Sequence, residues 1–484
     1  MAPETALDLS AIEQAAAIRR REVRARELTE AALLRAERAQ EAFGPFAHLD
    51  PDGALAAADA ADAATRNGAA GGASLAGVPY AVKDLALACA GMPFTCGSRL
   101  FGDFVPEVNS VAAARPKAAG MPVLGTTRSC EFGLLPVTEP IRFGPVRNPW
   151  NLDHSTGGSS GGAAAAVAAG VLAVAGASDA GGSIRIPAAC CGLVGLKPSR
   201  GRVSLAPFMG EHAFACEGVL TRTVADTAAM LDLLAGPELG DATWAPPPDR
   251  PFSEIDRSGR PLRIGVLLEP AFEGEVDERH RAAATRVGER LAELGHEVTE
   301  APRFWANPQL MELFGSAWMV GAAGFAGWAA QISGLEPGPD TLEPITLAFA
   351  QRAAEMPAPA FGGVLNGLHT YARAVVAGSA QFDAVLSPTL AQRPLPIGSF
   401  DEITDADEAI ARCIAFTPFT PVANITGQPA ISLPAGIADD GMPVGVMLTG
   451  RPLDEPTLLR LAADLEEAEG WTSSRPPAHA EVAA

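Results

Sequence analysis

The sequence predicts an α/β fold, in which short buried strands alternate with helices. Short apolar runs bounded by glycine, proline or polar residues have the length and composition of buried strands, at 122–127, 171–175, 262–268, 384–388 and 429–434. Between them lie segments with helix-capping patterns and apolar residues at helical spacing. The strand at 262–268, a helix closed by Gly295 and a strand from Glu297 give a β-α-β unit.

The N-terminal segment predicts two helices outside the catalytic core. Ser10-Ala11-Ile12-Glu13 is a capping-box pattern and predicts a solvent-facing helix in which Ile12, Ala16 and Val23 are apolar. The apolar positions expected on the second helix are Leu28, Ala32 and Ala36.

The middle of the chain predicts a helix followed by a strand. The alanine-rich run 163–170 favours a helix that ends at Gly170. The apolar run 171–175 then predicts a buried strand leading to Ser178 and Asp179. A serine at 183 would therefore lie just beyond a strand end.

The second half predicts further helices and an ordered connection. A cap at Thr223 starts a helix that stops at Gly236, and the proline-rich 245–248 is typical of a linker. Val287, Leu291 and Leu294 mark the next helix. The alanine-rich region 300–380 is expected to be helical, and Asp454 is expected to cap a last helix through Leu458, Leu461 and Leu465.

Five aromatic residues are spread through the region 300–380. They either pack in the core or line a lid over a substrate, and the sequence leaves both interpretations open. These residues are Trp305, Phe314, Trp318, Phe325 and Trp328.

Composition excludes several classes of partner. The 484 residues carry a formal net charge of −21, which disfavours binding to nucleic-acid phosphates and to anionic lipid, and we attribute this acidity to a role in solubility.

The seven cysteines include no CxxC spacing and are expected to be reduced, mostly buried thiols. The N-terminus lacks a secretory pattern, so we expect a cytoplasmic protein. No phosphate-loop, dinucleotide or zinc pattern appears, and we expect neither cofactor nor metal.

Two uncharged stretches, 155–178 and 313–335, are long enough to span a membrane. Both are rich in glycine, alanine and serine rather than in large aliphatic residues. We therefore expect helices enclosed by protein and no membrane span.

Three ordered motifs carry the chemistry. Lys83 lies in Gly77-Val78-Pro79-Tyr80-Ala81-Val82-Lys83-Asp84, Ser159 in a Gly-Gly-Ser-Ser-Gly-Gly loop, and Ser183 in Asp179-Ala180-Gly181-Gly182-Ser183-Ile184-Arg185. The spacing is 76 residues from Lys83 to Ser159 and 24 from Ser159 to Ser183.

Together these motifs resemble the amidase signature family. The resemblance is dense at 77–202 and spans about 10–470; it implies a single domain over 1–484 with a mixed central sheet covered on both sides by helices. It also implies a Ser, cis-Ser, Lys triad formed here by Ser183, Ser159 and Lys83, with Gly158 before the cis bond. Glu131-Phe132-Gly133 and Asn148-Pro149-Trp150-Asn151 are similar to bacterial aryl-acylamidases, nylon-oligomer cyclic-dimer hydrolases and urethanases. The chain departs from a common family pattern at Arg128 and Ala180.

The residue types suit amide hydrolysis. Ser183 is the candidate nucleophile, and the backbone N–H groups of Ala180, Gly181, Gly182 and Ser183 are candidate oxyanion donors. Lys83 follows apolar residues, and only desolvation or a charged neighbour would let it act as a base near neutral pH. The expected supports are Gly158, Ser160, Asp179 and Arg185, the last two forming either a charge pair that shapes the loop or a surface salt bridge.

One competing motif remains. Residues 158–162 also satisfy G-x-S-x-G, which would make Ser160 a nucleophile with a histidine partner, but the preceding segment is turn-like rather than an apolar strand. His212, His280, His296 and His369 lie in no recognisable triad setting.

The sequence thus predicts hydrolysis of a carboxamide or related C–N bond (amide, anilide or carbamate) of a fairly apolar small molecule through an acyl-enzyme. Ile184 and Ile186 beside Ser183 and the aromatic residues of 300–380 favour apolar substrates. The alternatives are a glutamine-amidase subunit of a tRNA-dependent amidotransferase and a non-catalytic binding protein on the same fold. The oligomeric state is left open.

Overall fold

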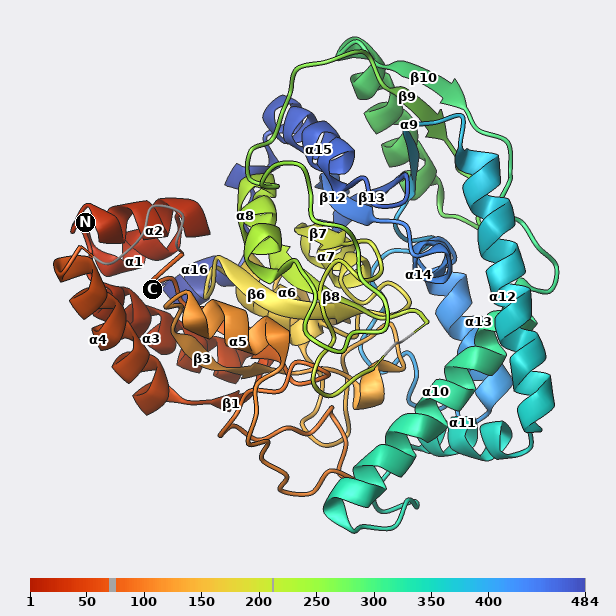
Figure 1. Ribbon diagram of the computed structural model, residues 1–484, viewed down its shortest axis with the longest axis horizontal. Helices are drawn as coiled ribbons and strands as arrows, with labels where there is room; N and C mark the ends of the chain where they lie inside the picture. The colour runs from red at the N-terminus through yellow and green to blue at the C-terminus, as the bar shows by residue number, and fades with distance from the viewer. Residues whose placement is uncertain (69–74, 211–212, 484) are drawn as a thin grey trace.

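The computed structural model describes residues 1–68, 75–210 and 213–483. Its centre is a mixed eight-stranded sheet in the order β10-β9-β11-β13-β12-β7-β8-β6 (Figure 1). The strands are β6 (Val174–Asp179), β7 (Val194–Lys197), β8 (Cys216–Thr221), β9 (Arg263–Val266), β10 (Glu297–Glu300), β11 (Ala384–Pro388), β12 (Ala430–Ile437) and β13 (Pro443–Gly450). β9 pairs in parallel with β10 and β11, and the other neighbours are antiparallel.

Two smaller sheets complete the strands. One has the order β1-β3-β2, and the other pairs β4 with β5. Their bounds are β1 (Phe46–Leu49), β2 (Tyr80–Lys83), β3 (Val123–Thr127), β4 (Arg147–Asn148) and β5 (Asn151–Ser155). β2 packs against β6, the edge strand of the large sheet, and so joins the smaller sheet to the larger.

Helices surround these sheets. The first half contains α1 (Pro3–Leu7), α2 (Ala11–Arg19), α3 (Ala25–Phe43), α4 (Pro51–Arg66), α5 (Val111–Ala118), η1 (Glu131–Gly133), α6 (Gly161–Ala168), α7 (Arg185–Cys191) and α8 (Val224–Leu234). The second half contains α9 (Glu278–Glu293), α10 (Leu310–Ser333), α11 (Pro344–Ala354), α12 (Ala358–Ser379), α13 (Ala406–Phe416), α14 (Pro421–Thr426), α15 (Glu455–Glu469), η2 (Trp471–Ser473) and α16 (Ala478–Ala483).

Two hydrophobic clusters lie on the two faces of the large sheet. α6 and α7 pack on one face, and α8, α9 and α15 pack on the other. β7 shows the alternation that this requires: a Cβ at Gly195 would meet Ala188 of α7, whereas Val194 and Leu196 join the cluster on the other face. The expected mixed sheet covered on both sides is confirmed.

The N-terminal helices follow their capping signals. Ser10 and Glu13 form the predicted capping box of α2. The helix is less solvent-facing than expected, because five of its residues are buried and its first N–H groups, those of Ala11 and Ile12, donate to the Asp226 carboxylate. Val23 lies beyond the end of α2, in the turn before α3.

The strand expected at 171–175 begins three residues later, as β6. The cause is the way in which α6 ends. Gly170 has a φ of +74°, and the N–H of Val171 donates to the carbonyl of Ala166 at 3.0 Å. This helix-terminating turn uses residues 170–172, so the strand starts at Val174 and Ser183 still follows its end.

Most elements of the second half agree with the prediction. The Thr223 and Asp454 side chains cap α8 and α15, and β9, α9 and β10 form the β-α-β unit. Leu294 was wrongly assigned to the helix: it is the C-cap residue after α9 and is 40% exposed. β13 was not predicted.

Region 300–380 is helical from Leu310, as predicted, and contributes α10, α11 and α12. Trp305 and Phe314 are buried, whereas Trp318, Phe325 and Trp328 are partly buried. By length and composition α10 is the one helix of the described chain that could cross a membrane, with a mean hydropathy of 1.2. It packs against α11 and α12, and eight of its 24 residues are buried.

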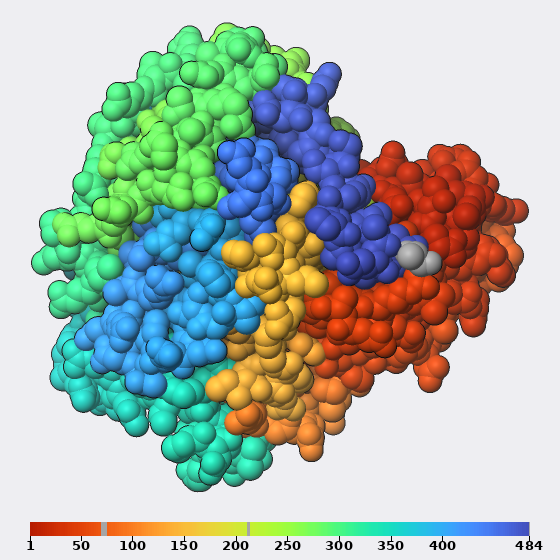
Figure 2. Space-filling view, turned by 180° about the vertical axis from the view of Figure 1, so that it is seen from behind, coloured from red at the N-terminus to blue at the C-terminus, as the bar shows by residue number. Residues whose placement is uncertain are grey.

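The two ends of the described chain lie together. Figure 2 shows the C-terminal segment against the N-terminal helices. His479 lies 3.1 Å from Asp8, and Arg38 donates to the carbonyl of Val482 at 3.2 Å. All seven cysteines are unpaired, and all but Cys413 are buried, as predicted.

Glu217 of β8 carries a buried carboxyl group whose desolvation is not offset by hydrogen bonds within the described residues. It faces Ser178 across the strand pair, and neither carboxyl oxygen has a hydrogen-bond partner in the described residues. Burial raises its pKa to about 8. Burying this carboxyl group costs more folding free energy when it is ionised than when it is protonated.

We expect Glu217→Leu to raise the melting temperature. Leucine has a similar volume but no polar group, and burying a polar group without a hydrogen-bond partner costs about 1–3 kcal/mol of folding free energy. The stability associated with protonated Glu217 is present below its unfolded pKa of 4.5 and is lost as the pH rises towards 8. The gain should therefore be larger at pH 8 than at pH 5, as measured by calorimetry. Glu466→Leu is the control and should lower the melting temperature, because Glu466 accepts the N–H of Val224 at 2.9 Å. A lower melting temperature for Glu217→Leu at both pH values would contradict this account.

Candidate active site

Lys83 ends β2 and is fully buried. Because β2 packs against β6, its amine reaches two serines of distant segments: Nζ lies 2.7 Å from Ser159 Oγ and 3.1 Å from Ser178 Oγ. A longer contact of 3.5 Å joins Nζ to the carbonyl oxygen of Ser178. The described residues place no carboxylate in hydrogen-bond contact with this amine.

The environment of Lys83 disfavours its ammonium form. Burial lowers the pKa to about 7, against smaller raising effects from Cys130 and Asp179. At neutral pH a large fraction of the amine is therefore unprotonated and able to accept a proton.

Ser159 lies in the loop between β5 and α6, and the Gly158-Ser159 peptide bond is cis. A side chain at residue 158 would overlap the backbone of Val137, which explains why glycine stands there. Ser159 is 1% exposed and accepts from Lys83 on one side while it borders a cavity on the other.

Ser183 follows β6 and precedes α7. It is 7% exposed and lines the same cavity as Ser159, although 24 residues separate the two in the chain. No hydrogen bond within the described residues engages its hydroxyl, so the oxygen is free to meet a ligand.

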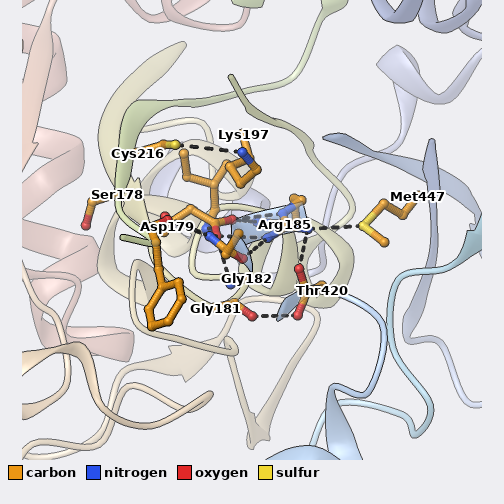
Figure 3. A network of polar contacts seen from close by, with 12 residues as sticks. Ser178, Asp179, Gly181, Gly182, Arg185, Lys197, Cys216, Thr420 and Met447 are labelled. Atoms are coloured by element: carbon orange, nitrogen blue, oxygen red, sulfur yellow. Dashed lines mark hydrogen bonds and ion pairs between the residues drawn. The ribbon is translucent and has the colours of Figure 1, made fainter. Parts of the chain in front are cut away.

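A buried ion pair shapes the loop before Ser183, as Figure 3 shows. Arg185 donates to both carboxyl oxygens of Asp179, at 2.9 and 3.0 Å, and both side chains are fully buried. The expected charge pair is present, and the surface alternative is wrong. Although burial alone would raise it, the charge of Arg185 lowers the pKa of Asp179 to about 2.

Asp179 also holds backbone groups of the loop. Its carboxylate accepts the N–H of Gly182 at 2.8 Å and that of Ile184 at 3.1 Å. The N–H of Gly182 is therefore already engaged, which corrects the expectation that it is a free oxyanion donor. The N–H groups of Gly181 and Ser183 have no acceptor in the described residues, and Ala180 lines the cavity beside them.

Residues near 420 support this loop and were missed by sequence reasoning. Thr420 donates its hydroxyl to the carbonyl of Gly181 at 2.7 Å. Asn424 donates to Asp179 at 2.8 Å and accepts from Arg185 at 2.6 Å. Ser178 was also missed as a partner of Lys83. Its place in the predicted strand-end segment was a usable signal, whereas the other two lie more than 230 residues from the loop.

Ser160 is placed differently from the other two serines. It is the N-cap residue of α6, is fully buried, and donates to the carbonyl of Ser178 at 3.3 Å. It does not line the cavity.

The histidines give no triad in the described chain. None lines the cavity; His280 and His296 are buried, and His369 is exposed on α12. His212 lies outside the described residues. Arg128, one of the departures from the family pattern, also lies away from the cavity and donates to the carbonyl of Phe46.

The cavity beside Ser183 measures about 270 Å³ and is mostly apolar. Its walls come from the loop after β2, from η1, from the segment before β8, and from α10 and α12. The largest apolar residues are Leu85, Phe132, Leu134, Leu205, Met209, Phe214, Trp318, Phe325, Phe361 and Leu365. Of the aromatic residues in 300–380, Trp318 and Phe325 line the cavity, whereas Trp305 packs in the core.

Comparison with known proteins agrees with the site. The Amidase family model matches residues 27–459. The 6-aminohexanoate-cyclic-dimer hydrolase of Paenarthrobacter ureafaciens is 34% identical over 417 residues, covering 83% of this chain and 85% of that protein.

Two solved structures extend the comparison. A 6-aminohexanoate cyclic dimer hydrolase superposes with a TM-score of 0.91 at 32% identity, covering 98% of this chain and 99% of the other. A bacterial aryl acylamidase of the amidase signature family superposes with a TM-score of 0.87 at 28% identity, covering 98% of both chains. The resemblance read from the three motifs is confirmed, and the chain belongs to the amidase signature family of hydrolases that act on amide C–N bonds.

Proposed function

We propose that Lys83, Ser159 and Ser183 form a catalytic triad that hydrolyses the C–N bond of a fairly apolar amide, anilide or carbamate through an acyl-enzyme. The observation that carries this proposal is the 2.7 Å contact between the buried amine of Lys83 and the Ser159 hydroxyl, beside a cavity that Ser183 shares. A histidine base is not needed where a lysine with a pKa of about 7 is available.

In the first half of the reaction Ser183 Oγ forms a bond to the substrate carbonyl carbon. Its proton passes to Ser159 Oγ while the Ser159 proton passes to neutral Lys83 Nζ. The resulting tetrahedral oxyanion collapses, the C–N bond breaks, and the leaving nitrogen takes the proton back along the same path. Water then repeats the sequence on the acyl-enzyme, releasing the acid and restoring Ser183.

The oxyanion donors in this mechanism are the backbone N–H groups of Gly181 and Ser183, with that of Ala180 as a third candidate. Two observations support this choice. The N–H groups of Gly181 and Ser183 have no acceptor in the described residues, whereas the N–H of Gly182 donates to the Asp179 carboxylate. One such donor contributes about 2.7–4 kcal/mol to transition-state stabilisation. In this proposal Gly158, Ser160, Asp179 and Arg185 position the loops and do not react.

The proposed substrate is a small apolar amide or carbamate. The apolar walls of the cavity support this choice, as does the cyclic amide named for the Paenarthrobacter ureafaciens relative. A carbamate needs no additional group, because serine attack and amine departure are the same. We further propose that the chain is one domain whose region 300–380 lines the substrate side, and that it works in the cytoplasm.

A glutamine-amidase subunit remains the second candidate function, because the same triad would serve it. Most of the residues that line the cavity are apolar, which suits the polar side chain of glutamine poorly, so we place it below the small-molecule amidase. A non-catalytic binding protein is disfavoured by the contact between Lys83 and Ser159.

We expect Ser183→Ala to lower kcat by at least about 10³-fold and to abolish labelling by a fluorophosphonate probe, as measured by mass spectrometry. Ser160→Ala is the control and should keep the label at Ser183. Labelling at Ser160, or unchanged turnover in Ser183→Ala, would refute the assignment of the nucleophile.

The pH dependence should report the amine of Lys83. Because neutral lysine is the base, kcat/KM should fall about tenfold per pH unit below about pH 7 and level off above it. Lys83→Ala should lose about 10²–10⁴-fold in kcat/KM and lose this inflection. A wild-type inflection near pH 10 would show that the amine titrates as an ordinary exposed lysine.

Substrate preference should follow the apolar walls. In a panel of anilides, aliphatic amides, carbamates and esters, we expect kcat/KM to rise with the apolar area of the substrate. Activity confined to small charged amides, or to glutamine in the presence of co-purifying subunits, would favour the second candidate function.

A further inference from the structure

Two cavities meet at Ser183. Beside the cavity of about 270 Å³, a second one of about 40 Å³ touches Ser183 and Gly181. Both cavities are lined by Gly133, Leu134 and Trp318. Ser183 therefore stands at the boundary between a large space and a small one, and these shared residues form the wall.

Trp318 is the largest part of this wall. It projects from α10, and its Nε1–H donates to the carbonyl of Leu134 at 3.1 Å. A Cβ placed on Gly181 would lie 3.2 Å from the indole, so the ring packs directly over the backbone of the nucleophile loop. The neighbouring Phe314 ring, 5.3 Å away between centroids, supports it from the side of the small cavity. The indole is thus fixed by a hydrogen bond, by packing and by its helix.

The small cavity is lined mainly by apolar groups from remote segments. Pro136, Ile186, Ile410 and Ile414 line it, and no charged side chain does. Its volume is much smaller than that of the neighbouring cavity, so it suits a short apolar group better than a long one.

We propose that Trp318 is a specificity-determining residue that makes the site asymmetric, so that accepted substrates carry a large apolar group on one side of the scissile carbonyl and a small group on the other. This inference rests on the proposed role of Ser183. It follows because the two substituents of a carbonyl carbon diverge when serine attacks, and each must enter a different space. A substrate that is bulky on both sides would have to displace the indole.

Difluoromethylene ketones test the inference without turnover. The Ser183 hydroxyl adds across the ketone C=O, forming a C–O bond; the carbonyl π bond breaks, and the hydroxyl proton ends on the new hemiketal through Ser159 and Lys83. Two probes carry an octyl arm on the carbonyl and either a methyl or an octyl group on the CF₂ carbon, so that their carbonyls have matched electronics. Fluorine NMR of the bound hemiketal reports binding, and titration gives the dissociation constants.

Hydrophobic burial alone predicts tighter binding of the probe with two octyl arms, because each buried methylene contributes about 0.8 kcal/mol. With the wall present we expect the opposite order in the wild type: the methyl-armed probe should bind at least about tenfold more tightly, a factor that corresponds to about 1.4 kcal/mol. Trp318→Ala should reverse that order, and Trp318→Phe, which keeps a ring but loses the hydrogen bond, should fall between.

Trp328→Ala is the matched control. Trp328 lies on the same helix and packs with Phe94 and Phe101 but lines neither cavity, so this variant should keep the wild-type order. Tighter binding of the two-octyl probe by the wild type, or the wild-type order retained in folded Trp318→Ala, would overturn the inference. A hemiketal signal that persists in Ser183→Ala, or that never forms in the wild type, would instead show that the proposed nucleophile is wrong, and the inference would fail with it.

Discussion

The desolvation of a single amine is the constraint on which the site depends. Lys83 would keep its proton in water, and only full burial at the end of β2 brings its pKa to about 7. Burial of an amine is tolerable when the amine is neutral and hydrogen bonded, and the serines at 159 and 178 supply those bonds. The packing of β2 against β6 thus both desolvates the amine and places it against the hydroxyls of Ser159 and Ser178.

The ion pair of Asp179 and Arg185 orders the loop before Ser183, which is a different role from that of the Lys83 amine. Two fully buried charges are not an efficient way to stabilise a fold, because desolvation offsets most of their attraction. Their value lies in geometry: one carboxylate accepts three backbone N–H groups, those of Gly182, Ile184 and Arg185, together with the guanidinium and the amide of Asn424. The N–H groups of Gly181 and Ser183 are left over by this arrangement. In the proposed mechanism these two groups are the oxyanion donors, and the carboxylate holds the neighbouring N–H groups.

Short-range sequence patterns predicted much of the fold, but they did not predict the contacts between segments that are distant in the chain. The caps at Ser10, Thr223 and Asp454 work through hydrogen bonds within four residues, so sequence spacing sufficed. The start of β6 was predicted three residues too early because the turn after α6 extends past Gly170, a detail set by two backbone hydrogen bonds to the carbonyl of Ala166. In the site, motif spacing identified Lys83, Ser159 and Ser183, but the engagement of Gly182 by Asp179 depends on loop geometry that spacing does not encode. Thr420 and Asn424 reach the loop only through tertiary packing, and no local pattern marks them.

The three polar residues of the site and part of the cavity wall come from different segments of the chain. Lys83, Ser159 and Ser183 come from the strands and loops of 77–202, where each position is fixed by buried polar contacts. Part of the wall around them comes from α10 and α12, whose side chains touch the site through apolar packing and one indole hydrogen bond, and the rest comes from segments within 85–217. A change in an apolar wall alters volume without disturbing a proton path, whereas a change in the loops alters both. A substitution in these two helices can therefore change the shape of the cavity while Lys83, Ser159 and Ser183 stay where β2, β6 and their loops place them.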